Sequence, residues 1–156
     1  HRPSNVDSAE NINKLIDMLN SMSEKIKVVF PIHPRTKNSL QNSNKHLRDD
    51  IMLLEPLPYF EFLGLMAKAK VVVTDSGGIQ EETTYLGVQC ITVRENTERP
   101  VTVDLGTNHL VGTDTSSVLN TFNDVINGKI KKGTIPPKWD GNAGERIVKI
   151  IWDFIH

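Results

Sequence analysis

The sequence has few of the features that mark several large protein classes. Cys90 is the only cysteine, so the chain forms no internal disulfide, and a reducing compartment is permitted. No run of about 18 apolar residues is present, and the amino terminus lacks the basic-then-apolar order of a signal peptide. We therefore expect a soluble, cytoplasmic protein that does not enter a membrane.

An excess of charge of either sign is also missing, because 18 Lys and Arg residues face 19 Asp and Glu residues and leave a net charge of -1. This balance gives no long-range attraction to nucleic acid, so neither nucleic acid nor membrane is expected as a partner. Cys, His and Asp residues show no metal-ligand spacing, and H-E-x-x-H, G-x-S-x-G, G-x-G-x-x-G and the Walker P-loop are absent. The sequence predicts no metal and no cofactor.

Hydrophobic residues are sufficient for one core, since they make up 38% of 156 residues. Apolar residues at three- and four-residue intervals predict helices at about 9–22, 61–69, 79–86, 118–127 and 143–154. Short apolar runs between them predict strands at 28–32, 51–54, 71–73, 90–93 and 109–111. This alternation indicates an α/β fold, a Rossmann-like parallel sheet with helices on both faces.

Two apolar faces are predicted to be buried. One belongs to the first helix and contains Leu15, Ile16, Met18 and Leu19, and the other belongs to the last helix and contains Ile147, Ile150, Ile151 and Phe154. Cys90 lies in an apolar run, so we expect an inert core thiol. Residues 140–143 are expected to form the turn before the last helix.

The most informative segment is Thr74-Asp75-Ser76-Gly77-Gly78-Ile79-Gln80-Glu81-Glu82, which follows the run Val71–Val73. A buried strand, a glycine-containing turn and a helix start give the geometry of a phosphate site, because the first helical N–H groups are unpaired and the glycines let a ligand approach. The alternative is that Ser76 and the glycines only cap a helix. In parallel sheets ligands bind at the carboxyl ends of the strands, where this turn lies.

Several motifs in order resemble one enzyme family. They are His1-Arg2, Pro31-Ile32-His33, the segment 74–82, Thr97-Glu98-Arg99-Pro100, Gly106-Thr107 and Asp140-Gly141-Asn142-Ala143. Together they are similar to the nucleotide-binding half of the non-hydrolysing UDP-N-acetylglucosamine 2-epimerases, which have the GT-B architecture. The likeness spans nearly the whole chain.

The resemblance implies that residues 1–156 are a single UDP-binding, carboxyl-terminal domain of a two-domain enzyme whose amino-terminal domain is absent. The implied reaction interconverts UDP-N-acetylglucosamine and UDP-N-acetylmannosamine by eliminating UDP and adding it back. In this family the carboxylates that move the C2 proton belong to the amino-terminal domain. His1 is then the only catalytic candidate in this chain, and the chain alone is expected to be inactive. The resemblance further implies UDP or a UDP-N-acetylhexosamine as ligand and a homodimer of the full-length protein.

Two alternatives stay open at this stage. One is the nucleotide-binding half of a GT-B glycosyltransferase, which would hold UDP in the same way but transfer a sugar. The other is a non-catalytic UDP-sugar sensor that keeps the fold.

For the diphosphate, the resemblance points to Ser76, Gly77, Gly78 and Arg99. A guanidinium presents paired donors that suit phosphate oxygens. The alternative for Arg99 is a surface ion pair with Glu95 or Glu98, and Arg94 is a weaker candidate for the same role.

For the nucleoside, Glu82 matches the family residue that accepts the ribose hydroxyls, whereas carboxylates near a helix start are also favoured without a ligand. Phe62 matches a position near the uracil ring, and periodicity alone favours core packing for it. His33 is expected to contact uridine or the diphosphate, with a histidine satisfied within its loop as the alternative. His1 and Arg2 match the family's His-Arg pair near the nucleotide sugar, with terminal fraying as the alternative. Ser4 departs from the family, which has Glu there.

Overall fold

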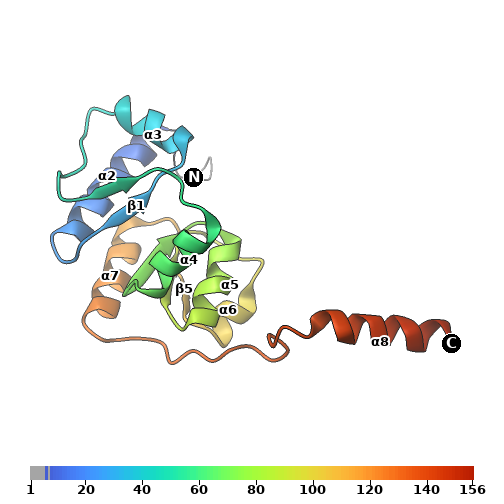
Figure 1. Cartoon of the computed structure of the whole chain (residues 1–156). Helices are drawn as coiled ribbons and strands as arrows, with labels where there is room; N and C mark the ends of the chain where they lie inside the picture. Colours follow the sequence, from blue (N-terminus) through green and yellow to red (C-terminus); the bar gives the residue numbers. More distant parts are fainter. Residues whose placement is uncertain (1–5, 7) are drawn as a thin grey trace.

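The computed structural model describes residue 6 and residues 8–156 and has the expected α/β organisation (Figure 1). The helices are α2 (Ala9–Ser23), α3 (Pro34–Gln41), α4 (Tyr59–Ala67), α5 (Gly77–Leu86), α6 (Pro100–Asp104), α7 (Thr115–Ile126) and α8 (Ala143–Ile155). The strands are β1 (Val29–Pro31), β2 (Met52–Leu54), β3 (Val71–Thr74), β4 (Gln89–Thr92) and β5 (Asn108–Leu110). Each predicted helix and strand is present within a few residues of its expected bounds.

Every strand pair in the described part of the chain is parallel, as predicted. The strands fall into a two-stranded sheet, β1-β2, and a three-stranded sheet in the order β3-β4-β5. In the first, Val29 is opposite Met52. In the second, Val71 is opposite Gln89 and Cys90 is opposite Asn108. Because parallel strands end at the same edge, the turns after β3 and β4 lie together at the carboxyl edge of the larger sheet.

Helices cover both faces of the larger sheet, because successive side chains of a strand point to opposite faces. Ile91 of β4 points into a core with Met18 and Met22 of α2 and with Val118 and Phe122 of α7. Its neighbours Cys90 and Thr92 point to the other face, which is covered by α5. A second cluster, formed by Val6, Ile12 and Ile16, lies between α2 and the smaller sheet's helix α3.

The start and end of α5 follow from its sequence. Ser76 is the N-cap in an extended conformation, and Gly87 ends the helix with φ of 71°. Only glycine adopts that left-handed conformation without a steric penalty from Cβ, so Gly87 gives a sharp helix end immediately before β4. The short connection keeps α5 against the sheet, with its N-terminus at the carboxyl edge of β3.

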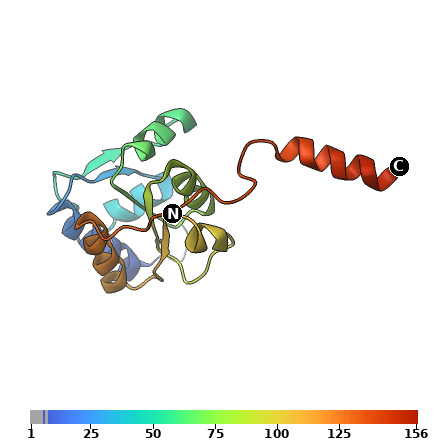
Figure 2. The ribbon, with the colours of Figure 1, turned by 90° about the horizontal axis from the view of Figure 1, so that it is seen from below.

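The prediction of a buried face on the last helix is wrong. Ile147, Ile150, Ile151 and Phe154 of α8 are 56%, 68%, 54% and 88% exposed, and α8 has no buried residue. Figures 1 and 2 show α8 projecting from the body at the end of an extended segment. Helix α8 has the predicted apolar face, but no other part of the described chain packs against it. The turn before α8 is as expected, because Asp140 accepts hydrogen bonds from the Asn142 N–H and the Arg146 guanidinium.

Two further predictions concern the core thiol and membranes. Cys90 is fully buried, and burial raises the pKa of its thiol above the ordinary value, so it has the inert character expected. Among residues 6 and 8–156, no helix combines the length and the apolar content that crossing a bilayer requires.

Candidate functional site

The N-terminus of α5 is open on its solvent side. Ser76 makes no side-chain capping bond, although its own N–H donates to Thr74 Oγ1 at 3.1 Å. Within the described residues, the N–H groups of Gly77, Gly78 and Ile79 find no acceptor. A helix start with unpaired N–H groups at the positive end of the dipole is suited to binding an anion.

The two glycines keep this helix start accessible. A Cβ added to Gly78 would meet nothing within 4 Å, and one added to Gly77 would meet only Glu98 Oε2, at 3.9 Å. Neither residue needs a positive φ. The fold of the chain itself therefore does not require glycine here, and the absence of two side chains leaves space beside the unpaired amides. We call this space, bounded by Ser76, Gly77 and Gly78, the anion cradle.

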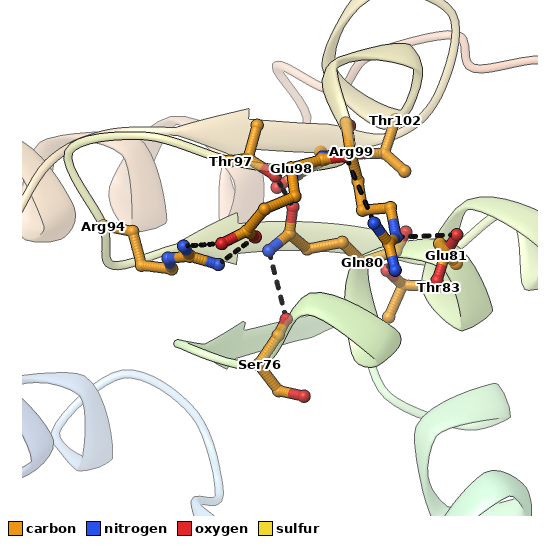
Figure 3. Close-up of polar contacts among 10 residues, drawn as sticks. Ser76, Gln80, Glu81, Thr83, Arg94, Thr97, Glu98, Arg99 and Thr102 are labelled. Carbon is orange, nitrogen blue, oxygen red and sulfur yellow. Dashed lines mark hydrogen bonds and ion pairs between the residues drawn. The ribbon is translucent and has the colours of Figure 1, made fainter. Parts of the chain in front are cut away.

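Arg99 lies beside α5 and is the N-cap residue of α6 (Figure 3). Its Nε lies 2.9 Å from Glu81 Oε1, and its Nη1 donates to the Glu98 carbonyl oxygen at 3.2 Å. The alternative considered for Arg99 was a surface ion pair with Glu95 or Glu98. Arg99 does form a surface ion pair, but its partner is Glu81. Because both side chains of this pair are more than a third exposed, the pair contributes little to stability and leaves the guanidinium accessible to a ligand.

Arg94 is used differently. It is 7% exposed and binds Glu98 through both terminal nitrogens, at 2.8 and 2.7 Å. These hydrogen bonds raise the pKa of the Arg94 guanidinium above its ordinary value. Because this forked pair engages both terminal nitrogens of a buried guanidinium, Arg94 holds the loop between β4 and α6. The Arg99 guanidinium is more exposed and is accessible to a ligand.

Glu82 lines a surface pocket of about 450 Å³ between α4 and α5. The pocket is formed by Tyr59, Leu63, Glu81, Glu82, Tyr85, Leu86 and Trp139. Aromatic and apolar walls with a carboxylate at one side suit a base and a ribose. Phe62 is partly buried in α4 and does not line this pocket, whereas Tyr59, one turn earlier, does.

The three histidine and arginine candidates outside this region differ in their placement. His33 is the N-cap of α3, and its Nδ1 accepts a hydrogen bond from the Arg35 N–H at 3.2 Å, which matches the alternative of a histidine satisfied within its loop. It follows β1 at the carboxyl edge of the smaller sheet. His1 and Arg2 lie outside the described residues.

Sequence reasoning missed the buried polar side chains beneath α5. Gln80, Thr92, Thr102 and Asn108 are all fully buried and joined by hydrogen bonds. Gln80 belongs to the segment 74–82, but the sequence alone assigns it no role, and its burial follows from tertiary packing. In the residues that the structure describes, no group of three or more His, Cys, Asp or Glu side chains is arranged to hold a metal ion.

Comparison with known proteins identifies relatives of the chain. The family model described as UDP-N-acetylglucosamine 2-epimerase matches residues 1–152. A UDP-N-acetylglucosamine 2-epimerase of Methanococcus maripaludis is 42% identical over 97% of the chain, and one of Methanocaldococcus jannaschii is 40% identical over 97%. The chain spans 43% and 42% of the length of these two curated relatives.

Similar solved structures are those of the same family. The crystal structure of the M. jannaschii UDP-GlcNAc 2-epimerase in complex with UDP-GlcNAc and UDP has a TM-score of 0.79 at 38% identity, over 97% of this chain and 43% of that one. The Neisseria meningitidis UDP-GlcNAc 2-epimerase bound to UDP-GlcNAc has a TM-score of 0.82 at 31% identity, over 98% of this chain and 43% of that one. The fold is thus that of one half of the GT-B architecture.

Proposed function

Because the chain belongs to the UDP-N-acetylglucosamine 2-epimerase family, we propose that it is the UDP-binding, carboxyl-terminal domain of an enzyme that interconverts UDP-N-acetylglucosamine and UDP-N-acetylmannosamine. The observation that carries this proposal is the anion cradle with Arg99 beside it. Three unpaired amides and one accessible guanidinium supply the donors that a diphosphate needs.

The nucleoside is assigned to the residues around the same helix. Glu82 accepts hydrogen bonds from the two ribose hydroxyls, because a carboxylate has two oxygens that suit a diol. The uracil ring lies toward α4, near Phe62 and the aromatic wall that Tyr59 provides. His33, His1 and Arg2 are assigned to the rim of the site, where the nucleotide faces the rest of the enzyme.

In the proposed reaction a base removes the C2 proton of the sugar, the C1–O bond to UDP breaks, and UDP leaves with the electron pair. Return of a proton to the other face of C2 and re-addition of UDP give the epimer. Negative charge grows on the diphosphate as the bond breaks. Donors fixed in advance around that charge stabilise the transition state more than the bound substrate, which is the basis of electrostatic catalysis.

The groups that move the proton are assigned to an amino-terminal domain of the full-length protein. Helix α8 supports the presence of such a domain, because its apolar face is not covered by the described residues. Its charged residues Glu145, Arg146, Lys149 and Asp153 share one side, and the wide remaining face is apolar and exposed. An isolated helix of 13 residues is marginal in water. We assign its covering surface to that domain, since the relatives are more than twice as long as this chain.

The experiment that tests the proposal incubates the chain with UDP-N-acetylglucosamine and, separately, titrates it with UDP in a calorimeter. We expect weak, saturable UDP binding and no UDP-N-acetylmannosamine, because the proton-transfer groups are on the other domain. A chain that binds no UDP contradicts the assignment of the site. Epimerisation by the chain alone contradicts the division of labour between domains.

The comparisons favour this function over a glycosyltransferase half, since the family model and the relatives reported above are epimerases. A cytoplasmic location, a homodimer of the full-length protein and a single domain over residues 1–156 stay predictions of the resemblance.

A further inference from the structure

Gln80 is a polar residue with no exposed surface, and its side-chain amide forms hydrogen bonds with Ser76, Thr97 and Asn108. Its Nε2 donates to the Ser76 carbonyl oxygen at 3.1 Å, and its Oε1 accepts from Thr97 Oγ1 at 2.6 Å and from Asn108 Nδ2 at 3.1 Å. Gln80 therefore binds Ser76, the N-cap residue of α5 and part of the anion cradle, directly. Through Thr97 it is connected to the loop that carries Arg99 (Figure 3).

The first connection runs to the N–H of Arg99. Thr97 Oγ1 donates to Gln80 Oε1 and accepts from the Arg99 N–H at 3.0 Å. A hydroxyl has one proton to donate and lone pairs to accept, so these two bonds use Thr97 in one consistent direction.

The second connection runs to the carbonyl of Arg99. Asn108 Nδ2 donates to Gln80 Oε1 and to Thr102 Oγ1, the latter at 3.0 Å, and Thr102 Oγ1 donates to the Arg99 carbonyl oxygen at 2.7 Å. Asn108 Oδ1 accepts from Thr92 Oγ1 of β4 at 2.6 Å, which fixes the orientation of the Asn108 amide on β5. Both backbone polar groups of Arg99 are thus held by hydroxyls that trace back to Gln80.

Stability alone does not favour such a network. Apolar side chains of the same shape are often neutral or better in a core, whereas a buried polar group that loses its partner is costly. A fully satisfied buried network, however, permits only one arrangement of the elements that it joins. Here the elements are the start of α5 and the loop that carries Arg99.

Building on the proposed function, we propose that Gln80, Thr97, Thr102 and Asn108 are positioning residues that hold the Arg99 guanidinium at a fixed place relative to the amides of Gly77 and Gly78, so that both bind one diphosphate. None of the four touches the ligand. Donors set in advance bind the diphosphate without an ordering cost at the moment of binding.

Thr97 gives the sharpest test, because it is a loop residue and only its hydroxyl carries the connection. Thr97→Val removes the hydroxyl at similar size, and Thr97→Ser keeps it. By calorimetry we expect Thr97→Val to weaken UDP binding about tenfold, the effect of one such hydrogen bond, and Thr97→Ser to match the wild type. Binding of uridine, which has no phosphate, is expected to be equal in all three proteins.

The same substitution in the Arg99→Ala background separates positioning from general loosening of the fold. If Thr97 acts through Arg99, Thr97→Val changes UDP affinity less than about twofold once Arg99 is gone, because coupled residues are not additive. Equal UDP affinity of wild type and Thr97→Val, a tenfold loss that persists without Arg99, or a parallel loss of uridine binding would each overturn the inference alone. Failure of the wild type to bind UDP would overturn it together with the proposed function.

Discussion

Replacing Arg99 by alanine is expected to weaken UDP binding by about 10- to 100-fold, because a hydrogen bond to a charged group contributes about 1.5–3 kcal/mol. The guanidinium offers two parallel donors to phosphate oxygens, and alanine offers none. The measurement is a calorimetric titration of wild type and Arg99→Ala with UDP at one fixed, low salt concentration.

The ion pair with Glu81 does not weaken this expectation. Arg99 and Glu81 side chains are 44% and 39% exposed, and exposed pairs of this kind contribute little. Arg99 therefore exchanges Glu81 for a phosphate, or adds the phosphate to it, at small cost. For the same reason we expect Arg99→Ala to leave thermal stability nearly unchanged.

Arg48→Ala is the matched control. Arg48 also forms exposed ion pairs, with Asp50 and Glu24. The substitution Arg48→Ala therefore removes the same charge from a different part of the surface. UDP affinity of Arg48→Ala should equal that of the wild type. If the two alanine variants bind UDP equally well, Arg99 has no part in the site.

The largest loss of stability is expected from Gly106→Ala. A Cβ on Gly106 would lie 2.4 Å from Thr84 Oγ1, 2.5 Å from the Thr102 carbonyl oxygen and 2.6 Å from Thr84 Cγ2. Thr84 is buried, and the Thr102 carbonyl belongs to the backbone of α6, so neither can move away freely. Overpacking of this kind costs about 1–3 kcal/mol and occasionally more. Urea unfolding at equilibrium measures the loss.

Gly64→Ala is the control and should have the opposite sign. Gly64 lies inside α4, and a Cβ there would meet nothing within 4 Å. Alanine in an open helical position stabilises by about 0.5–1 kcal/mol relative to glycine. An unfolding midpoint of Gly106→Ala at or above that of the wild type would contradict the close packing of Gly106 against Thr84.

The fold was largely predictable because its strands and main helices have apolar patterns of the right period. The helices α3 and α6 were missed for physical reasons. The sequence of α3 is mostly polar and buries only Thr36, and α6 has five residues, too few for a periodic signal. The pattern of α8 correctly predicted an amphipathic helix, but periodicity reports which side is apolar and not which surface covers it.

The site was predictable where its function depends on local sequence. A strand, a serine and two glycines before a helix give an open helix start whatever the surroundings, and the structure has that start at Ser76. Contacts between residues far apart in the sequence could not be predicted from local sequence patterns. Glu81 as the partner of Arg99 and Asn108 as the partner of Gln80 bring together residues 18 and 28 positions apart. Burial of Gln80 depends on how α5 lies on β4 and β5, which no local pattern states.

The most direct test of the account observes the amides of the anion cradle themselves. Backbone resonances of Gly77, Gly78 and Ile79 are followed by NMR while UDP, and separately inorganic pyrophosphate, is added. The account predicts saturable shifts of all three resonances with both ligands, because the diphosphate is the group that these amides bind. Resonances that stay unmoved while UDP shifts residues elsewhere would contradict it.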